Sequence, residues 1–505
     1  MKKFVVVVWF MCSVTCAQDL VIKEPCVDHK EGVPNREAAH SYFDEESNKL
    51  YLTYMDKKTL NLNVYSNMIK VGQYGFVRSE DTGLFNQVAD ALKKNEKEYY
   101  LFFSNPTTKE FSVQSINLIE KTTQLYPQAL MLDRDEFYMY SFCSRGEFFL
   151  LASIRRTSNV NLYKYNFSTN QFEKTLIELD AITYDNNPKK IKVWDIVSLD
   201  NKVSYYNPDF FKYTKNASTL SDLDPKVISR QIKFYNSDHH LKITIDGYNN
   251  RTRLIDINLD TKKSEFNSFE FEKIGAPSNE VYKNSFLLDN YLFQVKVSDE
   301  KMLFTIHDIK SKELLNSFSC ESKDSVISFA NSPMYKSISR QTLFNDDSEK
   351  EFKKVKKMLR VCSENNVFVG AIKNTDGEIE VTIGSYFMIE SSGSSMGGGP
   401  MAGGGGVSHG TGMYVGSSVS ENLYYFKSLL SADCTSRMSG SIFSSYYDLL
   451  TNRQKELSCP VKAQTIFSVK NTYYLGYFSS RTPYVENEDL NGVQSFYCIE
   501  KFGPK

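Results

Sequence analysis

The chain has 505 residues, of which 41% are hydrophobic, 24% charged and 14% aromatic. Its 60 basic and 61 acidic side chains give a formal net charge of −1, so it lacks the basic excess that nucleic-acid binding requires. After the first residues it has no apolar run close to the ~18 residues of a membrane-spanning helix. These features argue against a nucleic-acid partner and against a transmembrane helix in the mature chain.

The first 17 residues have the layout of a bacterial-type signal peptide. Two lysines precede an apolar run at residues 4–10, and small residues follow at Cys16 and Ala17. This is the order of charged start, apolar core and cleavage site. We therefore expect residues 1–17 to be removed and the mature chain to be periplasmic, outer-surface or extracellular. Lipid attachment at Cys16 is the alternative, although Thr15 before it is bulkier than the usual residue.

A phrase of strand, polar turn and strand recurs along the chain. It is clearest at residues 160–176, 254–269 and 303–318, with looser copies at residues 60–65 and 111–118. Equivalent apolar positions are Leu62, Val113, Leu162, Ile255 and Phe304. They are separated by 51, 49, 93 and 49 residues, and we interpret the 93 as two units. Several short strands per unit of about 40–50 residues are typical of β-propeller blades.

Four segments break this period. They are an irregular N-terminal segment at 18–40, a charged insertion at 331–360 with a helix-like run from 346, a Gly/Ser-rich insertion at 391–418, and an insertion at 431–460 with a second helix near 442–457. Without them about 380 residues remain, enough for seven units of about 50, or alternatively eight.

The pattern resembles β-propellers in architecture. We predict an all-β fold in which residues 41–505 form one propeller domain of about seven, alternatively eight, four-stranded blades with short helical insertions. The resemblance rests on period and pattern. Trp194-Asp195 is the only WD dipeptide, and sialidase boxes and paired kelch glycines are missing, so no single propeller family is indicated.

Two motifs suggest chemistry, and neither has the right context. Ser395 lies in a G-x-S-x-G match, but the glycine tract after it cannot hold the strained turn of a nucleophile elbow. His239 and His240 are adjacent, so on a strand they would face opposite sides and could not share a metal. We expect a solvated hairpin turn there and a mobile loop around Ser395. We assign no catalytic and no cofactor-binding residue.

A weak calcium motif lies near the C-terminus. Asn487, Asp489 and Asn491 sit at alternate positions before Gly492, as in calcium-binding loops. The first ligand is neutral and the twelfth position is Cys498 rather than Glu. We interpret this segment as an acidic surface loop, with calcium as the alternative.

Seven cysteines remain after the leader, so at least one cannot pair within the chain. An exported chain enters an oxidising compartment, where disulfides form. Cys434 and Cys459 bracket the insertion at 431–460, and Cys320 and Cys362 bracket the one at 331–360. We predict a disulfide for each pair, and the sequence does not show which cysteine stays free.

The functional expectation is a monomeric, non-enzymatic binding or scaffold protein of the cell envelope or exterior. It would use loops on one propeller face to bind a protein or a glycan, because propellers present several loops around one axis. The alternative is a secreted hydrolase or lyase with paired carboxylates at a central channel, since 61 acids cannot exclude such a pair.

Overall fold

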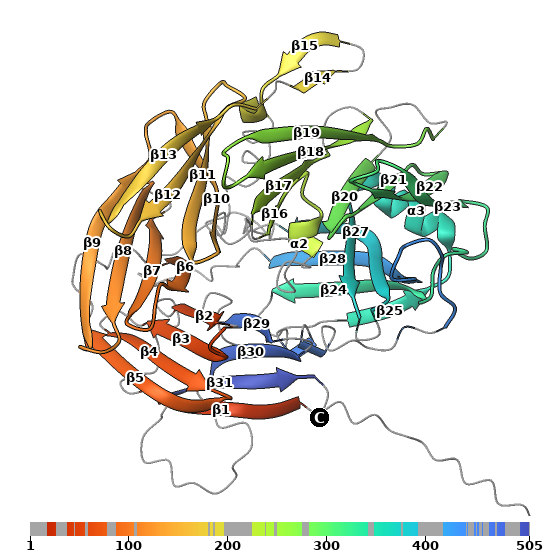
Figure 1. Cartoon of the computed structure of the whole chain (residues 1–505). Coiled ribbons are helices and arrows are strands. Elements are labelled where there is room, and N and C mark those ends of the chain that lie inside the picture. Colours follow the sequence, from red (N-terminus) through yellow and green to blue (C-terminus); the bar gives the residue numbers. More distant parts are fainter. Residues whose placement is uncertain are drawn as a thin grey trace, which may run out of the picture. The chain divides into compact units, whose positions relative to one another are not determined.

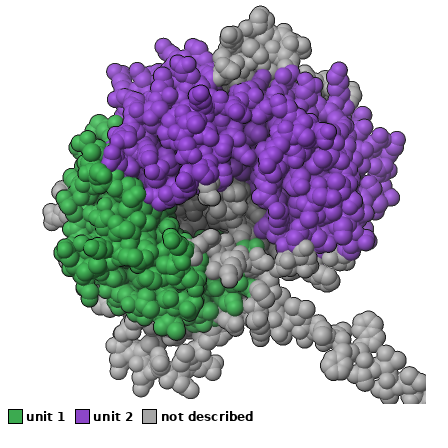
Figure 2. Space-filling model, in the orientation of Figure 1, with its two compact units in different colours: residues 1–131, 167–171, 444–505 green, residues 132–166, 172–443 purple. Residues whose placement is uncertain are grey.

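The structure is a computed structural model of the chain (Figure 1). It describes residues 18–503 apart from the segments 27–37, 78–86, 196–224, 275–281, 342–347, 392–417 and 480–494, most of 441–463, and stretches of one to three residues between strands. The described chain divides into two compact units, coloured separately in Figure 2. Unit 1 comprises residues 1–131, 167–171 and 444–505, and unit 2 comprises residues 132–166 and 172–443.

Unit 1 contains three four-stranded antiparallel sheets. Two of them, β2–β5 and β6–β9, follow the chain order, and the third has the order β1-β31-β30-β29. The strands are β1 (Gln18–Cys26), β2 (Ala38–Asp44), β3 (Lys49–Met55), β4 (Thr59–Ser66), β5 (Ile69–Val77), β6 (Gln87–Lys93), β7 (Glu98–Asn105), β8 (Glu110–Asn117), β9 (Thr122–Met131), β29 (Thr465–Val469), β30 (Thr472–Ser479) and β31 (Ser495–Phe502).

Unit 2 contains three more four-stranded sheets, β10–β13, β16–β19 and β20–β23, and one five-stranded sheet with the order β25-β24-β28-β27-β26. A separate ribbon pairs β14 with β15. The strands are β10 (Glu136–Ser144), β11 (Glu147–Ile154), β12 (Val160–Asn166), β13 (Gln171–Ile177), β14 (Ile182–Tyr184), β15 (Asn187–Ile191), β16 (Ile232–Asn236), β17 (His240–Ile245), β18 (Arg251–Asn258), β19 (Ser264–Glu270), β20 (Tyr282–Leu288), β21 (Tyr291–Val297), β22 (Lys301–Asp308), β23 (Leu314–Glu321), β24 (Met334–Gln341), β25 (Ser348–Phe352), β26 (Asn366–Lys373), β27 (Ile379–Ser391) and β28 (Ser418–Leu430).

These seven sheets are the blades of a β-propeller, which confirms the predicted fold class. The five apolar positions that defined the repeat all lie on the third strand of their blade. Leu62, Val113, Leu162, Ile255 and Phe304 belong to β4, β8, β12, β18 and β22. Each is at most 1% exposed, because an inner strand of a stacked blade is covered on both faces.

The polar turn of the repeat has one geometry in three blades. A side-chain oxygen of Asn117, Asn258 or Asp308 accepts hydrogen bonds of 2.8–3.0 Å from the backbone N–H groups two and three residues later. The fourth residue after each is a lysine with φ between 56° and 64°, at Lys121, Lys262 and Lys312. Asn and Asp favour such turns because their short side chains can accept hydrogen bonds from nearby backbone N–H groups. The sequence repeat therefore reflects the residues that the turn needs as well as the alternation of the strands.

The 93-residue spacing does not contain two blades, so that interpretation is wrong. Between Leu162 and Ile255 the described residues outside the two blades include the β14–β15 ribbon, a helical turn at residues 193–195 and the short helix α2 (Pro225–Ile228), but no further sheet of blade size. The blades β10–β13 and β16–β19 share one hydrophobic core, which includes Tyr140 and Phe234. Their rings stack with centroids 4.9 Å apart. The extra residues are therefore an insertion between consecutive blades.

The segment 18–40 is not irregular throughout, which corrects a second prediction. Residues Gln18–Cys26 form β1, which pairs antiparallel with β31, the last strand of the chain. Ile22 is 5% exposed, whereas Leu20 is 37% exposed. Its partner lies more than 450 residues away in the sequence, so no local repeat signal marked the strand.

The charged segment 331–360 is only partly an insertion. Its strands β24 and β25 join the five-stranded blade, and helix α3 (Val355–Glu364) begins nine residues later than the helix-like run at 346. The helix buries Val355, Met358 and Leu359 against the β20–β23 blade and the five-stranded blade. This spacing of three and four residues places one apolar face on the blades and leaves the lysines between them on the other.

Within the segment 431–460, Arg453 is held on the blade that contains β31. Residues 449–450 and 452–453 are helical, in agreement with part of the predicted helix. Arg453 forms two 2.9 Å contacts with the carboxylate of Glu500, which is 1% exposed, and its guanidinium lies 5.6 Å from the ring of Tyr477. A two-pronged ion pair of this kind fixes the position of Arg453 on the blade.

A buried ion pair within the β16–β19 blade is hydrogen-bonded to the neighbouring β20–β23 blade. Lys233 donates to Asp246 at 3.2 Å, and both side chains are fully buried. Asp246 also accepts hydrogen bonds from the hydroxyl of Thr252 at 2.7 Å and from the backbone N–H of Ser285 at 2.9 Å. Gln294 extends the network by donating to Thr252 at 2.9 Å. The carboxylate is thus held by one charge and two neutral donors from adjacent blades.

Candidate functional site

The first and third turns of a blade lie at the same end of it. In three blades the N–H of the second residue of the third turn donates to a carbonyl of the first turn, at 2.7–2.9 Å. The pairs are Leu118 with Lys97, Leu259 with His239, and Ile309 with Asn290. The bond holds the two turns together, so side chains carried by them converge at one end of the blade.

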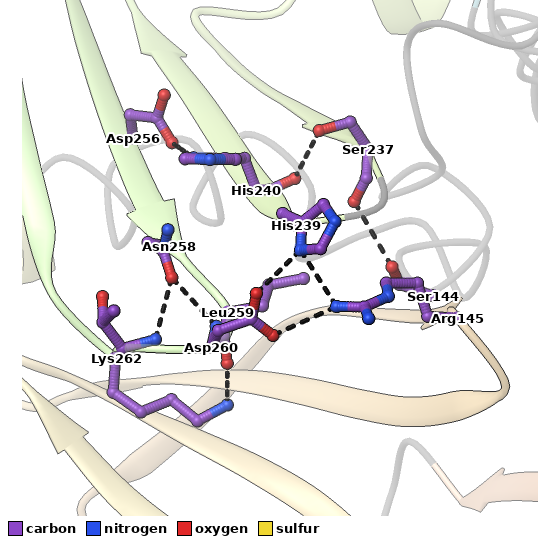
Figure 3. A network of polar contacts seen from close by, with 11 residues as sticks. Ser144, Arg145, Ser237, His239, His240, Asp256, Asn258, Leu259, Asp260 and Lys262 are labelled. Carbon is purple, nitrogen blue, oxygen red and sulfur yellow. Dashed lines mark hydrogen bonds and ion pairs between the residues drawn. The ribbon is translucent and has the colours of Figure 1, made fainter.

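A polar cluster, which we call the turn cluster, occupies this end of two neighbouring blades (Figure 3). It consists of Arg145 from the first turn of β10–β13 and of His239 and Asp260 from the first and third turns of β16–β19. Arg145 Nη1 lies 3.2 Å from Asp260 Oδ1 and 2.9 Å from His239 Nδ1. His239 Nδ1 lies 2.7 Å from Asp260 Oδ2. The side chains are 50%, 50% and 57% exposed, so a ligand can reach all three.

The Nδ1 atom of His239 faces a donor and an acceptor at once. It can donate to Asp260 only when it carries a proton, and it can accept from Arg145 only when it does not. The contact that forms therefore depends on the tautomer and on the charge of the ring. The hydrogen bond from His239, together with the charges of His239 and Arg145, lowers the pKa of the Asp260 carboxyl.

The second histidine points to a different partner. His240 Nδ1 lies 2.6 Å from Asp256 Oδ1, and His240 begins β17 while His239 lies in the hairpin turn before it (Figure 3). The two rings therefore serve separate carboxylates. In the part of the chain that the structure describes, no three His, Cys, Asp or Glu side chains are grouped so that they could hold a metal ion.

Lys262 adds a positive charge at the edge of the turn cluster. Its ammonium donates to the carbonyl of Leu259 and lies 5.1 Å from the ring centroid of Phe149 on the neighbouring blade. Burial, with the nearby charge of Lys164 as a smaller cause, lowers the pKa of Lys262. Lys262, Arg145 and the two histidines give this end of the two blades several hydrogen-bond donors. Asp260 adds an exposed carboxylate.

The predicted site residues near the C-terminus and in the glycine tract lie outside the described residues. This applies to the calcium candidates Asn487, Asp489 and Asn491, and also to Ser395. The sequence had singled out His239 and His240 but not Arg145 or Asp260. Asp260 follows the Asn258 of the repeated turn, and Arg145-Gly146 is a tight turn with two positive φ angles. A comparison of equivalent turn positions in different blades would have pointed to Arg145 and Asp260.

The predicted disulfide between Cys320 and Cys362 is not formed. Both are buried thiols within the hydrophobic core of unit 2, on β23 and α3. Cys434 is also a buried thiol, and its predicted partner Cys459 lies outside the described residues. Burial raises the pKa of Cys320 and of Cys434 to about 12, so these thiols stay protonated at neutral pH. Cys320 and Cys362 bracket an insertion in the sequence but are not bonded to each other in the structure.

Comparison with known proteins indicates no family. No protein-family model matches the chain, and no curated protein matches it. Among solved structures it is similar to the WD40 domain of SCAP from fission yeast, with 10% identity, a TM-score of 0.30, and coverage of 92% of this chain and 82% of that one.

Two further matches are enzymes. Prolyl oligopeptidase B from Galerina marginata has 8% identity and a TM-score of 0.28, with 69% of this chain and 47% of that chain covered. The dihydro-heme d1 dehydrogenase NirN has 10% identity and a TM-score of 0.26, with 56% and 47% covered. The chain thus spans about half the length of these two enzymes. No helix among the described residues is long and apolar enough to cross a membrane.

Proposed function

We propose that the protein is an exported, non-enzymatic binding or scaffold protein that holds a protein or glycan partner through the turns at one end of its blades. The observation that carries this proposal is the turn cluster of Arg145, His239 and Asp260. Three chemically different polar groups from two blades are exposed together, and a backbone hydrogen bond joins the two turns that carry His239 and Asp260.

The blades supply a rigid scaffold for such a surface. Loops placed by a rigid framework are the usual location of binding residues, because they can vary without disturbing the core. Arg145 offers planar donors, Asp260 offers two acceptor oxygens, and His239 can act as donor or acceptor. This combination suits a partner rich in hydroxyl, amide or carboxylate groups.

Export is the second part of the proposal. The layout of residues 1–17 supports a cleaved leader, which would place the turn cluster in the periplasm, on the outer surface or outside the cell. Glycans and envelope proteins are the polymers present there. Retention of the mature chain in the culture supernatant or envelope fraction, and its loss when residues 1–17 are deleted, would test this part.

The binding part is tested by comparing three forms of the mature chain on a glycan array and in a pull-down from the source cell's envelope. The forms are wild type, the triple variant R145A/H239A/D260A, and the matched control K310A. Lys310 occupies the turn position of the next blade that corresponds to Asp260, two residues after the turn's Asp or Asn. We expect a glycan or protein retained by wild type and K310A and lost by the triple variant. Equal retention by all three forms would contradict the proposal, and turnover of a glycoside or ester panel would favour the hydrolase alternative.

A further inference from the structure

A second buried lysine in unit 2 is held by two neutral acceptors. Lys296 on β21 is 7% exposed, and its ammonium donates to the side-chain oxygen of Asn250 at 2.6 Å and to the backbone carbonyl of Glu272 at 2.9 Å. Both acceptors are neutral and both come from the neighbouring blade, at the ends of β18 and β19. Among the described residues no acidic side chain forms an ion pair with Lys296.

Two neutral acceptors match an uncharged amine better than an ammonium. An ammonium has three donor hydrogens and no lone pair, whereas a neutral primary amine has two donor hydrogens and one lone pair. With Asn250 and Glu272 occupying two hydrogens, the neutral form is fully satisfied and keeps its lone pair for another bond. The charged form would keep one donor without an acceptor at a buried position, which costs free energy.

A second positive charge lies directly across the sheet. Lys283 on β20 is the cross-strand partner of Lys296, so the two side chains emerge on the same face. Burial, with the charge of Lys283 as the smaller cause, lowers the pKa of Lys296 to about 8. A desolvated lysine beside another cation is the arrangement that makes an amine nucleophilic near neutral pH.

We propose that Lys296 is a nucleophilic amine that captures a small 2-oxo acid as a Schiff base. The Lys296 lone pair attacks the carbonyl carbon, a C–N bond forms, and the carbonyl oxygen leaves as water once it has taken up the two amine protons. No oxidant or reductant is required for this step. The half-buried Lys283 ammonium supplies the charge that would attract the carboxylate of such a compound. The limited exposure of Lys296 restricts the partner to a small molecule.

The probe is glyoxylate, used on the wild-type mature chain with cyanoborohydride, which reduces any imine to a stable carboxymethyl amine. Peptide mass mapping then gives a rate for each lysine between pH 6 and pH 11, with exposed Lys353 as the internal reference. At pH 7 about 10% of an amine with a pKa of 8 is neutral, against about 0.03% at the usual pKa, a ratio of about 300. We expect Lys296 to react at least ten times faster than Lys353, with a rate midpoint near pH 8.

Two variants separate the charge of Lys283 from general effects. K283M removes the neighbouring positive charge. We therefore expect the midpoint of the Lys296 rate to move to higher pH and the rate at pH 7 to fall several-fold. K273M removes an exposed lysine next to Glu272 and should leave the midpoint and the rate of Lys296 unchanged. Reaction of Lys296 no faster than Lys353, or a midpoint above pH 10, would overturn the proposal. So would a K283M profile identical to that of wild type.

Discussion

Lys233 and Lys296, two buried lysines of unit 2, lie in adjacent blades and meet opposite surroundings. Lys233 faces the carboxylate of Asp246, whose remaining acceptor sites are used by Thr252 and Ser285. Lys296 faces an amide oxygen, a backbone carbonyl and another lysine. The first is an ion-pair network, and in the second the described residues supply neutral acceptors and no ion-pair partner.

This difference shows that burial alone does not decide what a buried lysine does. A charge taken out of water is tolerated when a partner and further hydrogen bonds replace its hydration, and the loss of one partner is then severe. A lysine without such a partner lowers its pKa instead and becomes reactive. Lys233 therefore neutralises Asp246 within its own blade, while Lys296 is the amine that we propose to be nucleophilic.

The largest effect is expected from breaking the complete network. K233M leaves Asp246 as a buried carboxylate without its cation, and we expect the free energy of unfolding to fall by about 3–5 kcal/mol. Urea unfolding at pH 7 measures it. The double variant K233M/D246N removes both charges and should recover part of the loss. A K233M protein as stable as wild type would mean that the ion pair contributes nothing.

The next effect is a pH dependence carried by Lys296. Its pKa is about 8 in the folded chain and 10.5 as the ordinary value, so between these the unfolded chain binds more protons than the folded one. The contribution of Lys296 to the free energy of unfolding therefore rises with pH in this window, by up to about 3 kcal/mol, and is flat below pH 8. The measurement is the difference between wild type and K296M in urea unfolding from pH 7 to pH 10.5. A constant difference would contradict the depressed pKa.

A smaller effect is expected from K296M itself at pH 7. Methionine fills a similar volume and removes the cost of burying the amine, while two hydrogen bonds to neutral acceptors are lost. These terms oppose each other, so the free energy of unfolding should change by less than about 1 kcal/mol in either direction. A loss as large as that of K233M would show that the two lysines play the same structural role.

The smallest effect concerns the exposed ion pair of the turn cluster. R145A removes a contact between side chains that are half exposed, where water screens the charges. We expect Tm to stay within about 2 °C of wild type. A larger drop in a thermal melt would indicate that the turn cluster holds the two blades together, in which case its loss could not be used as a clean binding variant.

The sequence predicted the blades because their information is local. Positions such as Leu62 and Ile255 alternate with polar residues within one strand, and the Asn or Asp of each third turn lies a few residues away. Sequence analysis missed β1 because a strand whose partner is distant in the sequence leaves no local pattern. It also interpreted the insertion after β13 as a blade.

The sites were harder to predict for the same reason. Lys296 sits in a strand whose two faces are both covered, and nothing in its own segment shows that Asn250 and Glu272 approach it from the next blade. Arg145 meets Asp260 across 115 positions of sequence. The pairing of such residues depends on how blades stack, which a single sequence does not encode in any short window.

The most direct test of the contrast between the two lysines is the titration of Lys296 itself. In protein carrying ¹³C-labelled lysine, the Cε resonance of Lys296 can be assigned by its absence in K296M and followed by NMR from pH 6 to pH 12. The surroundings of neutral acceptors and a neighbouring lysine predict a midpoint near pH 8. A midpoint near 10.5, as for an exposed lysine, would show that Lys296 remains an ordinary ammonium and would contradict the distinction drawn between it and Lys233.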